Sequence, residues 1–325
     1  MDEFARIYVL GLRAALNWPL YLSNLNKYFM KKMVLTGLLL STLSTWSQNN
    51  ITFEEYDLDN GLHVILHEDH STPIVAVTVL YHVGSKNENP ERTGFAHFFE
   101  HLLFEGSENI GRGEFDNYVT NAGGALNANT SQDRTFYFEL LPSNHMELGL
   151  WLESERMLHA NIQTVGVETQ REVVKEEKRQ RVDNQPYGSW RENMMKRLYT
   201  EHPYNWVPIG SMDHLNAAQL DEFMVFYKKF YIPNNATLSI AGDIDVENTK
   251  EMIEAYFGEI PSGIPVEQPT VIEPPLGGEK TATIYDNIQL PAVMMGYRMP
   301  PQTSADAYAL QMASTVLSGG PSSRM

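Results

Sequence analysis

Two histidines and a glutamate stand close together in an otherwise apolar segment, residues 94–104. The apolar background predicts a buried helix. On a helix, His97 and His101 lie one turn apart on the same face, about 6 Å along the axis. Two imidazoles at that spacing can bind one metal ion, and Glu100 lies beside His101, where it can reach the open side of that ion. The segment therefore predicts a helix that carries a metal site.

A structural interpretation of this segment competes with the metal site, because a single histidine on an apolar helix is more often a core residue than a ligand. Three polar groups among phenylalanines and leucines are harder to explain in this way. Burying them costs on the order of several kcal/mol unless each is paired or metal-bound. The pattern His-x-x-Glu-His is also that of the inverted zinc peptidases, with two histidine ligands and a glutamate base. We therefore expect His97 and His101 to bind the metal and Glu100 to act as the base.

Charge and cysteine content exclude several other classes of protein. The 325 residues carry a formal net charge of −17. An acidic chain without a basic block argues against nucleic acid and against an anionic membrane surface as partners. The absence of cysteine excludes disulfides, thiolate zinc sites and cysteine nucleophiles. The length suffices for one large or two medium domains.

Residues 30–48 have the three parts of a secretory signal peptide. A short basic start at 30–33 is followed by an apolar run at 34–40 and a small, polar exit that ends near Ser47–Gln48. The apolar run is too short to span a bilayer comfortably. We therefore expect cleavage near Gln48, a periplasmic or secreted protein, and no stable membrane span. We interpret residues 1–29 as an upstream extension, with translation starting at Met30 or Met33.

The rest of the chain mixes strand and helix patterns, which predicts an α+β fold with a mixed, largely antiparallel sheet packed with helices. We expect one complete domain at 49–260, a Pro/Gly-rich linker at 261–279 and an incomplete second α+β domain at 280–325, so that the chain is truncated. The expected strands are 51–56, 62–67, 73–83, 125–130, 134–140, 234–242, 280–285 and 289–298. The expected helices are 94–104, 113–121, 142–159, 165–182, 191–199, 216–231, 246–257 and 305–317.

The highly charged helix predicted at 165–182 is a candidate source of a third metal ligand. A zinc site needs such a ligand from the protein, and a catalytic site leaves the fourth position for water. Glu176 and Glu177 are the candidate carboxylates. The same charges are also typical of a solvated helix face with i,i+4 pairs, and the residues alone leave the choice between the two glutamates open.

Several further patches resemble, in order, the pitrilysin (insulinase) family of zinc metallopeptidases, especially its bacterial members similar to the mitochondrial processing peptidase. The resemblance runs over most of residues 52–325. Besides the histidine helix, the patches are Gly94, Gly123–Gly124 with Asn127–Ala128 and Thr130, Arg171–Glu177, Pro208–Gly210, Tyr231–Asn235, Ala241–Asp243 and Ser322–Arg324.

This resemblance implies a zinc-dependent endopeptidase that hydrolyses peptides or small unfolded proteins. It implies Zn²⁺ bound by His97, His101 and Glu177, with Glu176 as the second choice for the third ligand. Glu100 is then the general base that takes a proton from the attacking water.

The resemblance also implies how substrate binds and which neighbours support the site. Asn127 and Ala128 are expected to contact the backbone of a peptide that adds as a strand to the sheet edge. The family usually has a glutamate seven residues before the third ligand, where this chain has Gln170. An amide at that position can still form a hydrogen bond beside the site.

Family members consist of two halves that close over the substrate, so we expect a homologous second half or a partner subunit. An arginine and a tyrosine from the far half have no match here, which predicts weak hydrolysis by this chain alone. The alternative is a non-catalytic peptide-binding or assembly subunit of a heterodimer, and the intact metal motif argues against it. A serine hydrolase or a nucleotide-binding enzyme is disfavoured, because the sequence lacks G-x-S-x-G, a P-loop and G-x-G-x-x-G after a strand.

Overall fold

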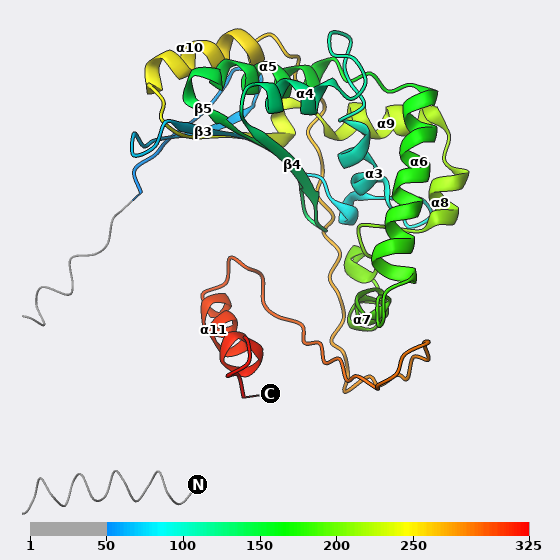
Figure 1. Cartoon of the computed structure of the whole chain (residues 1–325). Helices are drawn as coiled ribbons and strands as arrows, with labels where there is room; N and C mark the ends of the chain where they lie inside the picture. Colours follow the sequence, from blue (N-terminus) through cyan, green and yellow to red (C-terminus); the bar gives the residue numbers. More distant parts are fainter. Residues whose placement is uncertain (1–50, 325) are drawn as a thin grey trace, which may run out of the picture. The chain divides into compact units, whose positions relative to one another are not determined.

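The computed structural model describes residues 51–324, whose strands form one six-stranded sheet (Figure 1). The strands, in chain order, are β1 (Glu54–Asp57), β2 (His63–Glu68), β3 (Ile74–Tyr81), β4 (Ala125–Thr130), β5 (Thr135–Pro142) and β6 (Ala236–Gly242). In space their order is β1-β2-β6-β3-β5-β4. Only β2 and β6 are parallel neighbours, which confirms the mixed, largely antiparallel sheet. The predicted extension 1–29 and signal peptide 30–48 lie outside the described residues.

The central strand β3 shows why one face of the sheet is buried. Alternate residues Val75, Val77 and Val79 are fully buried, whereas the residues between them are half-buried. This period of two is the mark of a strand with one face in the core, and β-branched side chains fit such a surface well. The neighbouring strand β5 continues the pattern, with the buried Tyr137 directly opposite Val79.

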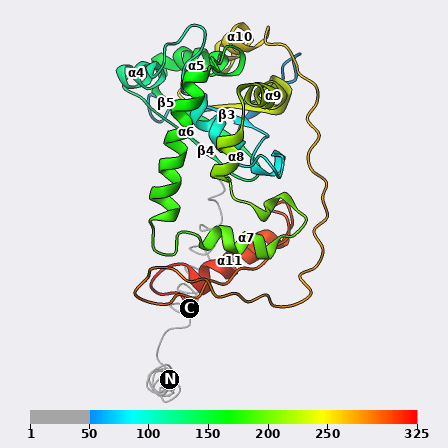
Figure 2. The same ribbon diagram turned by 90° about the vertical axis from the view of Figure 1, so that its right-hand side faces the viewer.

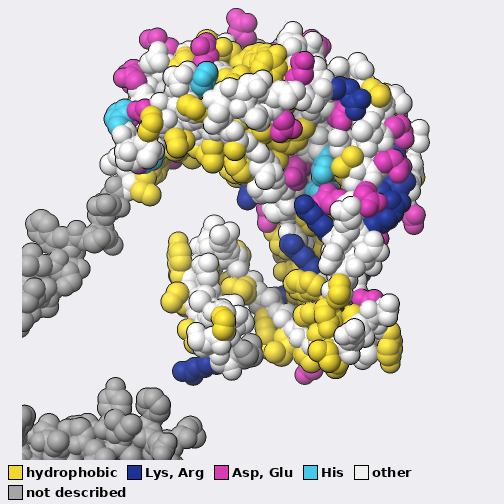
Figure 3. All heavy atoms as spheres, viewed as in Figure 1, with side chains coloured by type: hydrophobic (Ala, Val, Ile, Leu, Met, Phe, Trp, Pro, Cys, Tyr) yellow, Lys and Arg dark blue, Asp and Glu magenta, His cyan; other side chains and the backbone are white. Residues whose placement is uncertain are grey.

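Three helices cover the buried face of the sheet (Figure 1). α5 (Met146–Leu158) packs on β3 and β5, α10 (Val246–Phe257) packs on α5 and β2, and α4 (Glu114–Asn121) packs on α5 and β4. An added Cβ on Gly149 of α5 would meet Cγ2 of Val77 at 2.9 Å, so this helix approaches the sheet closely. The opposite face of the sheet is turned away from these helices and carries hydrophobic side chains (Figure 3).

A second group of helices surrounds α3 (Phe95–Leu102), the helix that carries the two histidines. α3 packs against α6 (Thr164–Lys178) and α9 (Leu220–Phe230), and α8 (Met212–Ala217) packs on α6. The rings of Phe95 and Phe98 stack on Phe223 of α9, with centroids 4.7 Å apart in both pairs. These aromatic contacts bury the apolar face of α3. The histidine face of α3 is left for α6.

The single helix predicted at 216–231 is wrong, because the chain forms two helices there, α8 and α9. The backbone is extended at Ala218, and Gln219 begins α9 with a capping box that includes Glu222. The carbonyl of Ala218 accepts a hydrogen bond from Nη2 of Arg171 on α6 at 3.2 Å. The capping pattern therefore ends one helix and begins another inside a continuous apolar period.

The segment after α6 leads away from the sheet (Figure 2). α6 continues into a π-helical turn, Arg179–Asp183, and α7 (Trp190–Leu198) follows. Short 3₁₀ helices elsewhere are Ser85–Asn87, Ser143–His145, Pro203–Asn205 and Pro233–Asn235. Among the helices of residues 51–324, none is long and apolar enough to cross a membrane.

The C-terminal part contains one predicted helix and lacks the predicted strands. α11 (Asp306–Ser318) confirms the helix expected at 305–317. The strands expected at 280–285 and 289–298 are wrong, since a strand needs a hydrogen-bonded neighbouring strand and no strand among the described residues pairs with either segment. Their apolar side chains are consequently exposed, Tyr285 by 93% and Val293 by 85%.

Candidate metal centre

α3 presents His97 and His101 on one face, as the spacing predicts. The helix begins at Gly94, whose backbone has a φ of 98°, a left-handed conformation that glycine adopts readily. The two imidazole rings lie 4.8 Å apart, centroid to centroid. His97 is buried and His101 is half-buried. Figure 3 shows histidine and acidic side chains together in this region, at the surface of the molecule.

Glu177 of α6 completes a group of three possible metal ligands. One ligand atom from each of His97, His101 and Glu177 lies within 4.8 Å of the other two. Oε2 of Glu177 lies 3.1 Å from Nε2 of His101 and 3.5 Å from Nε2 of His97. The other carboxylate oxygen, Oε1, pairs with Nη1 of Arg181 at 2.7 Å. The packing of α6 against α3 therefore brings the third candidate ligand to the two histidines.

Glu176 lies elsewhere on α6. Its carboxylate is exposed and accepts hydrogen bonds from Arg179 at 3.0 Å and from Gln180 at 2.9 Å. Adjacent residues on a helix point about 100° apart, so only one of the two glutamates can face α3. The geometry selects Glu177, a choice that the residues alone left open.

The donor set fits zinc. Two imidazole nitrogens and one carboxylate oxygen are typical zinc ligands, and three protein ligands leave a position for water. Oε2 of Glu177 is buried and receives no hydrogen bond from the described residues, and the same holds for Nδ1 of His97. A buried carboxylate oxygen without a donor is costly unless a cation compensates it.

Protonation also favours metal binding at this group. Burial, and then the nearby charge of His101, lower the pKa of His97 to about 4. Burial works to raise the pKa of Glu177, but His101, His97 and Arg181 together lower it below its usual value. A neutral imidazole and an ionised carboxylate are the forms that bind a metal ion.

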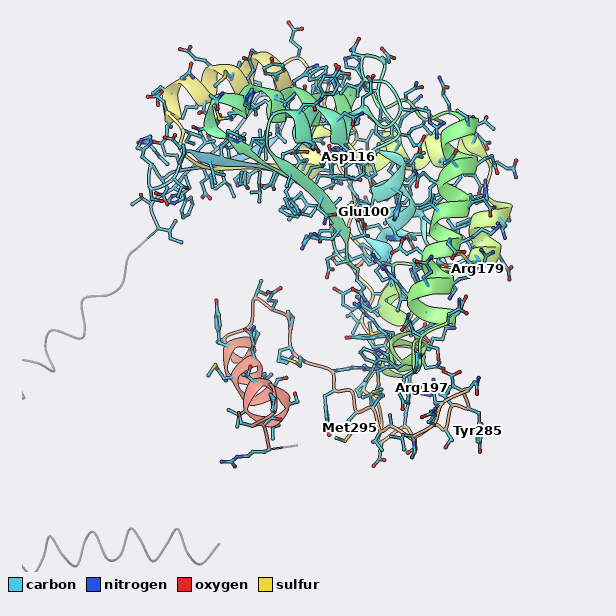
Figure 4. All side chains as sticks on the ribbon, in the orientation of Figure 1. Glu100, Asp116, Arg179, Arg197, Tyr285 and Met295 are labelled. Atoms are coloured by element: carbon cyan, nitrogen blue, oxygen red, sulfur yellow. The ribbon has the colours of Figure 1, made fainter. Side chains whose placement is uncertain are left out.

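Glu100 lies on the side of α3 that faces β4 (Figure 4). Oγ1 of Thr130, the last residue of β4, donates a hydrogen bond to Oε2 of Glu100 at 2.6 Å. Burial raises the pKa of Glu100, and the Thr130 hydrogen bond opposes that rise. A raised pKa makes a carboxyl group a better acceptor for the proton of a nearby water, as a general base requires. Thr130 was part of a sequence patch, but its contact with the predicted base had no signal in the sequence.

The N-terminal end of α3 is fixed by a buried carboxylate. Glu88 accepts hydrogen bonds from the backbone N–H groups of Gly94 and Ala96, both at 2.9 Å. Gly210 packs against the same turn so closely that an added Cβ would meet the backbone nitrogen of Gly94 at 2.3 Å. The Pro208–Gly210 patch of the sequence therefore packs against the start of the helix that carries the two histidines.

The C-terminal end of α3 is fixed by two side chains from the core. The hydroxyl of Tyr137 donates to the carbonyl of Phe99 at 3.1 Å, and Nη1 of Arg156 donates to the carbonyl of Leu103 at 2.9 Å. Sequence reasoning missed these anchors and Glu88, because each contact joins residues far apart along the chain.

Asn127 and Ala128 lie on β4, which is an edge strand of the sheet. No described strand pairs with the outer side of β4. Asn127 is exposed, and its Oδ1 accepts a hydrogen bond from the backbone N–H of Ala128 at 2.8 Å. Gln170 lies on α6 and donates a hydrogen bond to Glu105. The roles expected for these residues stay predictions.

Comparison with known proteins identifies the family. Residues 63–207 match the profile of the insulinase family, peptidase family M16. The zinc protease PqqE of Helicobacter pylori is 35% identical over 308 residues, which cover 91% of this chain and 69% of that protein. The chain belongs to the M16 peptidase family. Residues 217–325 match a second profile, the peptidase M16 inactive domain, which is partly present.

Other relatives and solved structures agree with this assignment. An uncharacterized zinc protease of Mycobacterium leprae is 27% identical and is matched over 82% of this chain. The crystal structure of a protease from H. pylori is 35% identical with a TM-score of 0.66, covering 69% of this chain. The structure of the first half of the periplasmic protease PqqL from Escherichia coli is 27% identical with a TM-score of 0.60, covering 67% of this chain.

The M16 chain described here spans only part of these relatives. It covers 60% of the M. leprae protein, 54% of the H. pylori protease structure and 49% of the PqqL first half.

Proposed function

We propose that this M16 chain is a zinc-dependent endopeptidase that hydrolyses peptides or small unfolded proteins. The observation that carries the proposal is the convergence of His97, His101 and Glu177 within 4.8 Å, next to Glu100. The naming of the matched relatives as zinc proteases supports it. Zinc held by these three residues would polarise the scissile carbonyl and lower the pKa of water from 15.7 towards about 7.

Glu100 moves the protons of the reaction. It takes a proton from the attacking water and later passes one to the leaving amine. Thr130 holds the carboxylate through its hydrogen bond of 2.6 Å, so the base has a fixed orientation. The same hydrogen bond joins the base to the end of β4. A peptide bound along β4 would therefore pass close to the base.

The substrate adds to the sheet as a strand along the free edge of β4. Such an edge presents unpaired N–H and C=O groups that an extended peptide can use. Asn127 and Ala128 lie in the middle of β4 and are the residues we assign to substrate backbone contacts. The hydrogen bond from the Ala128 N–H to the Asn127 side chain gives way when a peptide takes that N–H.

A partner half and an export signal complete the proposal. The PqqL structures indicate a two-half protease, and this chain covers only part of its relatives. We therefore propose a homologous second half or partner subunit. The predicted signal peptide at 30–48 supports a periplasmic or secreted location. The alternative function, a non-catalytic peptide-binding subunit, would share the sheet edge but make no use of Glu100.

Zinc content and hydrolysis test this proposal separately. Elemental analysis of the full chain should find one zinc per chain, lost or strongly reduced in Glu177→Gln. Glu176→Gln is the matched control, because it makes the same change at the exposed neighbouring residue and should keep its zinc. Cleavage of a quenched fluorescent peptide should fall at least about 100-fold in Glu100→Gln with zinc retained. A folded parent chain without zinc would contradict the metal site. A parent rate clearly above background that Glu100→Gln leaves unchanged would contradict the role of Glu100 and favour the binding-subunit alternative.

A further inference from the structure

Glu105 and Gln170 form a second polar contact between the end of α3 and α6. Nε2 of Gln170 donates a hydrogen bond to Oε1 of Glu105 at 2.6 Å. The Glu105 side chain is buried, with only 8% of the residue exposed. Glu105 lies in the turn that follows α3, where its N–H bonds to the carbonyl of Leu102. The proposed catalytic steps use neither residue, so the contact needs a separate explanation.

The residues of this contact lie in line with the candidate metal ligands, along one line of residues at α3 and another on α6. The first line is His97 and His101, one turn apart on α3, followed four residues later by Glu105 in the turn after that helix. The second line is Gly166, Gln170 and Glu177, which are spaced by whole turns of α6 and lie along one face. The metal ligands pair at one end of the two lines and the Glu105–Gln170 hydrogen bond joins them near the other. The two contacts therefore fix the same helix against the same neighbour.

Close packing and a second donor hold Glu105 in place. An added Cβ on Gly166 would meet Cγ of Glu105 at 3.3 Å, so the missing side chain lets α6 approach. Nε of Arg112 donates to Oε2 of Glu105, and its Nη2 donates to Oγ1 of Thr169 on α6 at 3.2 Å. Both carboxylate oxygens of Glu105 thus have donors, and the carboxylate is tied to α6 at two neighbouring residues.

The carboxylate of Glu105 favours a hydrogen-bond donor at position 170. The family resemblance implies a glutamate there. Here the contact already contains the carboxylate of Glu105, so the residue at 170 has to donate a hydrogen bond. A glutamate would place two carboxylates against each other in a buried contact, which disfavours the ionised form of both. The carboxylate of the contact is therefore on the α3 side.

We propose that Glu105 and Gln170 are positioning residues for the metal centre. Their hydrogen bond sets α6 against α3 so that Glu177, two turns further along α6, reaches His97 and His101. The inference rests on the proposed function, because it concerns a ligand of the proposed zinc ion. Residues that orient metal ligands typically change metal affinity by about 10- to 100-fold when they are replaced.

Zinc affinity of the full 325-residue chain tests this role, measured by competition with a chelating dye. We expect Gln170→Glu to weaken zinc binding by about 10- to 100-fold. Glu105→Gln combined with Gln170→Glu restores one amide and one carboxylate to the contact, and should return the affinity to within about threefold of the parent chain. Gln180→Glu is the matched control, since it adds the same charge to an exposed position near Glu177 and should not weaken binding.

A spectroscopic measurement separates positioning from simple loss of stability. The visible spectrum of bound Co²⁺ should change in Gln170→Glu and return in the double variant, because it reports the ligand set directly. A merely structural role would lower the urea midpoint of the zinc-free protein and leave the metal affinity and the spectrum unchanged. If Gln170→Glu does not fold, Gln170→Ala removes the donor without adding charge and should still weaken zinc binding.

The outcomes distinguish this inference from the proposed function. A parent chain that binds zinc, with Gln170→Glu and Gln170→Ala of equal affinity to it, would overturn the positioning role alone. A double variant no better than Gln170→Glu would also overturn it. A folded parent chain that binds no zinc would overturn the proposed function, and this inference with it.

Discussion

The ionisation of Glu88 affects the stability of the fold at the N-terminal end of α3, the helix that carries the two histidines. The carboxylate is buried and accepts hydrogen bonds from Gly94, Ala96 and the indole N–H of Trp206. Burial raises the pKa of Glu88 to about 8 despite these hydrogen bonds, which favour the charged form. The folded state therefore binds this proton more tightly than the unfolded chain, whose value is near 4.5. The stability that Glu88 contributes is complete below about pH 4.5 and is lost as the pH rises through about 8.

We predict that Glu88→Gln flattens the pH dependence of the free energy of unfolding between about pH 5 and 8. One pKa unit corresponds to about 1.4 kcal/mol, so the parent chain loses at most on the order of 5 kcal/mol over this range relative to the variant. Urea unfolding at several pH values measures this difference. Glu91→Gln, at an exposed position nearby, is the control. Parallel curves for the parent chain and Glu88→Gln would contradict the prediction.

Whether a residue of the candidate site could be predicted from the sequence depends on how far along the chain its partners lie. His97, Glu100 and His101 could be predicted because helical spacing alone places them together. Glu177 needed the family resemblance, and its choice over Glu176 needed the facing helix. Thr130 and the anchors of α3 could not be predicted, since their contacts depend on how distant elements pack.

Among the helices and strands, those whose ends are set by nearby cap or turn residues were predicted best. The helix expected at 246–257 matches α10 in full, and Asp245 caps it through a hydrogen bond to the N–H of Asn248. The hairpin of β1 and β2 also follows its turn residues. The break at Ala218 was missed because the capping box at Gln219 lies within a continuous helical pattern of apolar residues. The strands predicted at 280–285 and 289–298 were wrong because local propensity does not supply a neighbouring strand.

The buried guanidinium of Arg156 on α5 contacts the C-terminal end of α3. Its Nε pairs with Glu153 at 3.0 Å, and its Nη2 lies 3.6 Å from Glu139, all three side chains being buried. It also stacks over the ring of Tyr137 at 4.3 Å and donates to the carbonyl of Leu103. Burial, and then the neighbouring Glu153, raise the pKa of Glu139 well above its usual value, so Glu139 is neutral and the one cation balances Glu153 while it holds the end of α3.

We predict that Arg156→Met lowers the free energy of unfolding by about 3–5 kcal/mol, because it leaves the buried Glu153 without its cation and removes the cation beside Glu139. Combining it with Glu139→Leu and Glu153→Leu should recover most of the loss, since an apolar cluster of similar volume replaces the charges. Urea unfolding of the parent chain, the single variant and the triple variant measures both effects. A triple variant as unstable as Arg156→Met would show that the charges are not the cause.

On the scale of the whole molecule, Glu273 joins the C-terminal segment to the part that carries the metal site. Its carboxylate accepts hydrogen bonds from the backbone N–H groups of Thr200, Glu201 and His202, at 2.7–2.9 Å. Arg298 pairs with it at 3.0 Å from further along the same segment. Burial opposes the ionisation of Glu273, but these N–H groups outweigh it and lower the pKa to about 2. The linker predicted at 261–279 therefore contains a fixed contact.

We predict that Glu273→Ala exposes the segment after residue 260 to proteases while the preceding part stays intact. Hydrogen bonds to a charged group are worth about 1.5–3 kcal/mol, so losing them raises the population of the open segment by at least about tenfold. Cleavage by a dilute protease follows that population when opening and closing are fast. A time course analysed by mass spectrometry should show cuts between residues 274 and 300 at least about tenfold faster than in the parent chain. Glu279→Ala is the control, because that exposed glutamate bonds only to Thr281 within the same segment. Equal cleavage rates for Glu273→Ala and the parent chain would mean that the apolar contacts of the segment, and not this carboxylate, hold it in place.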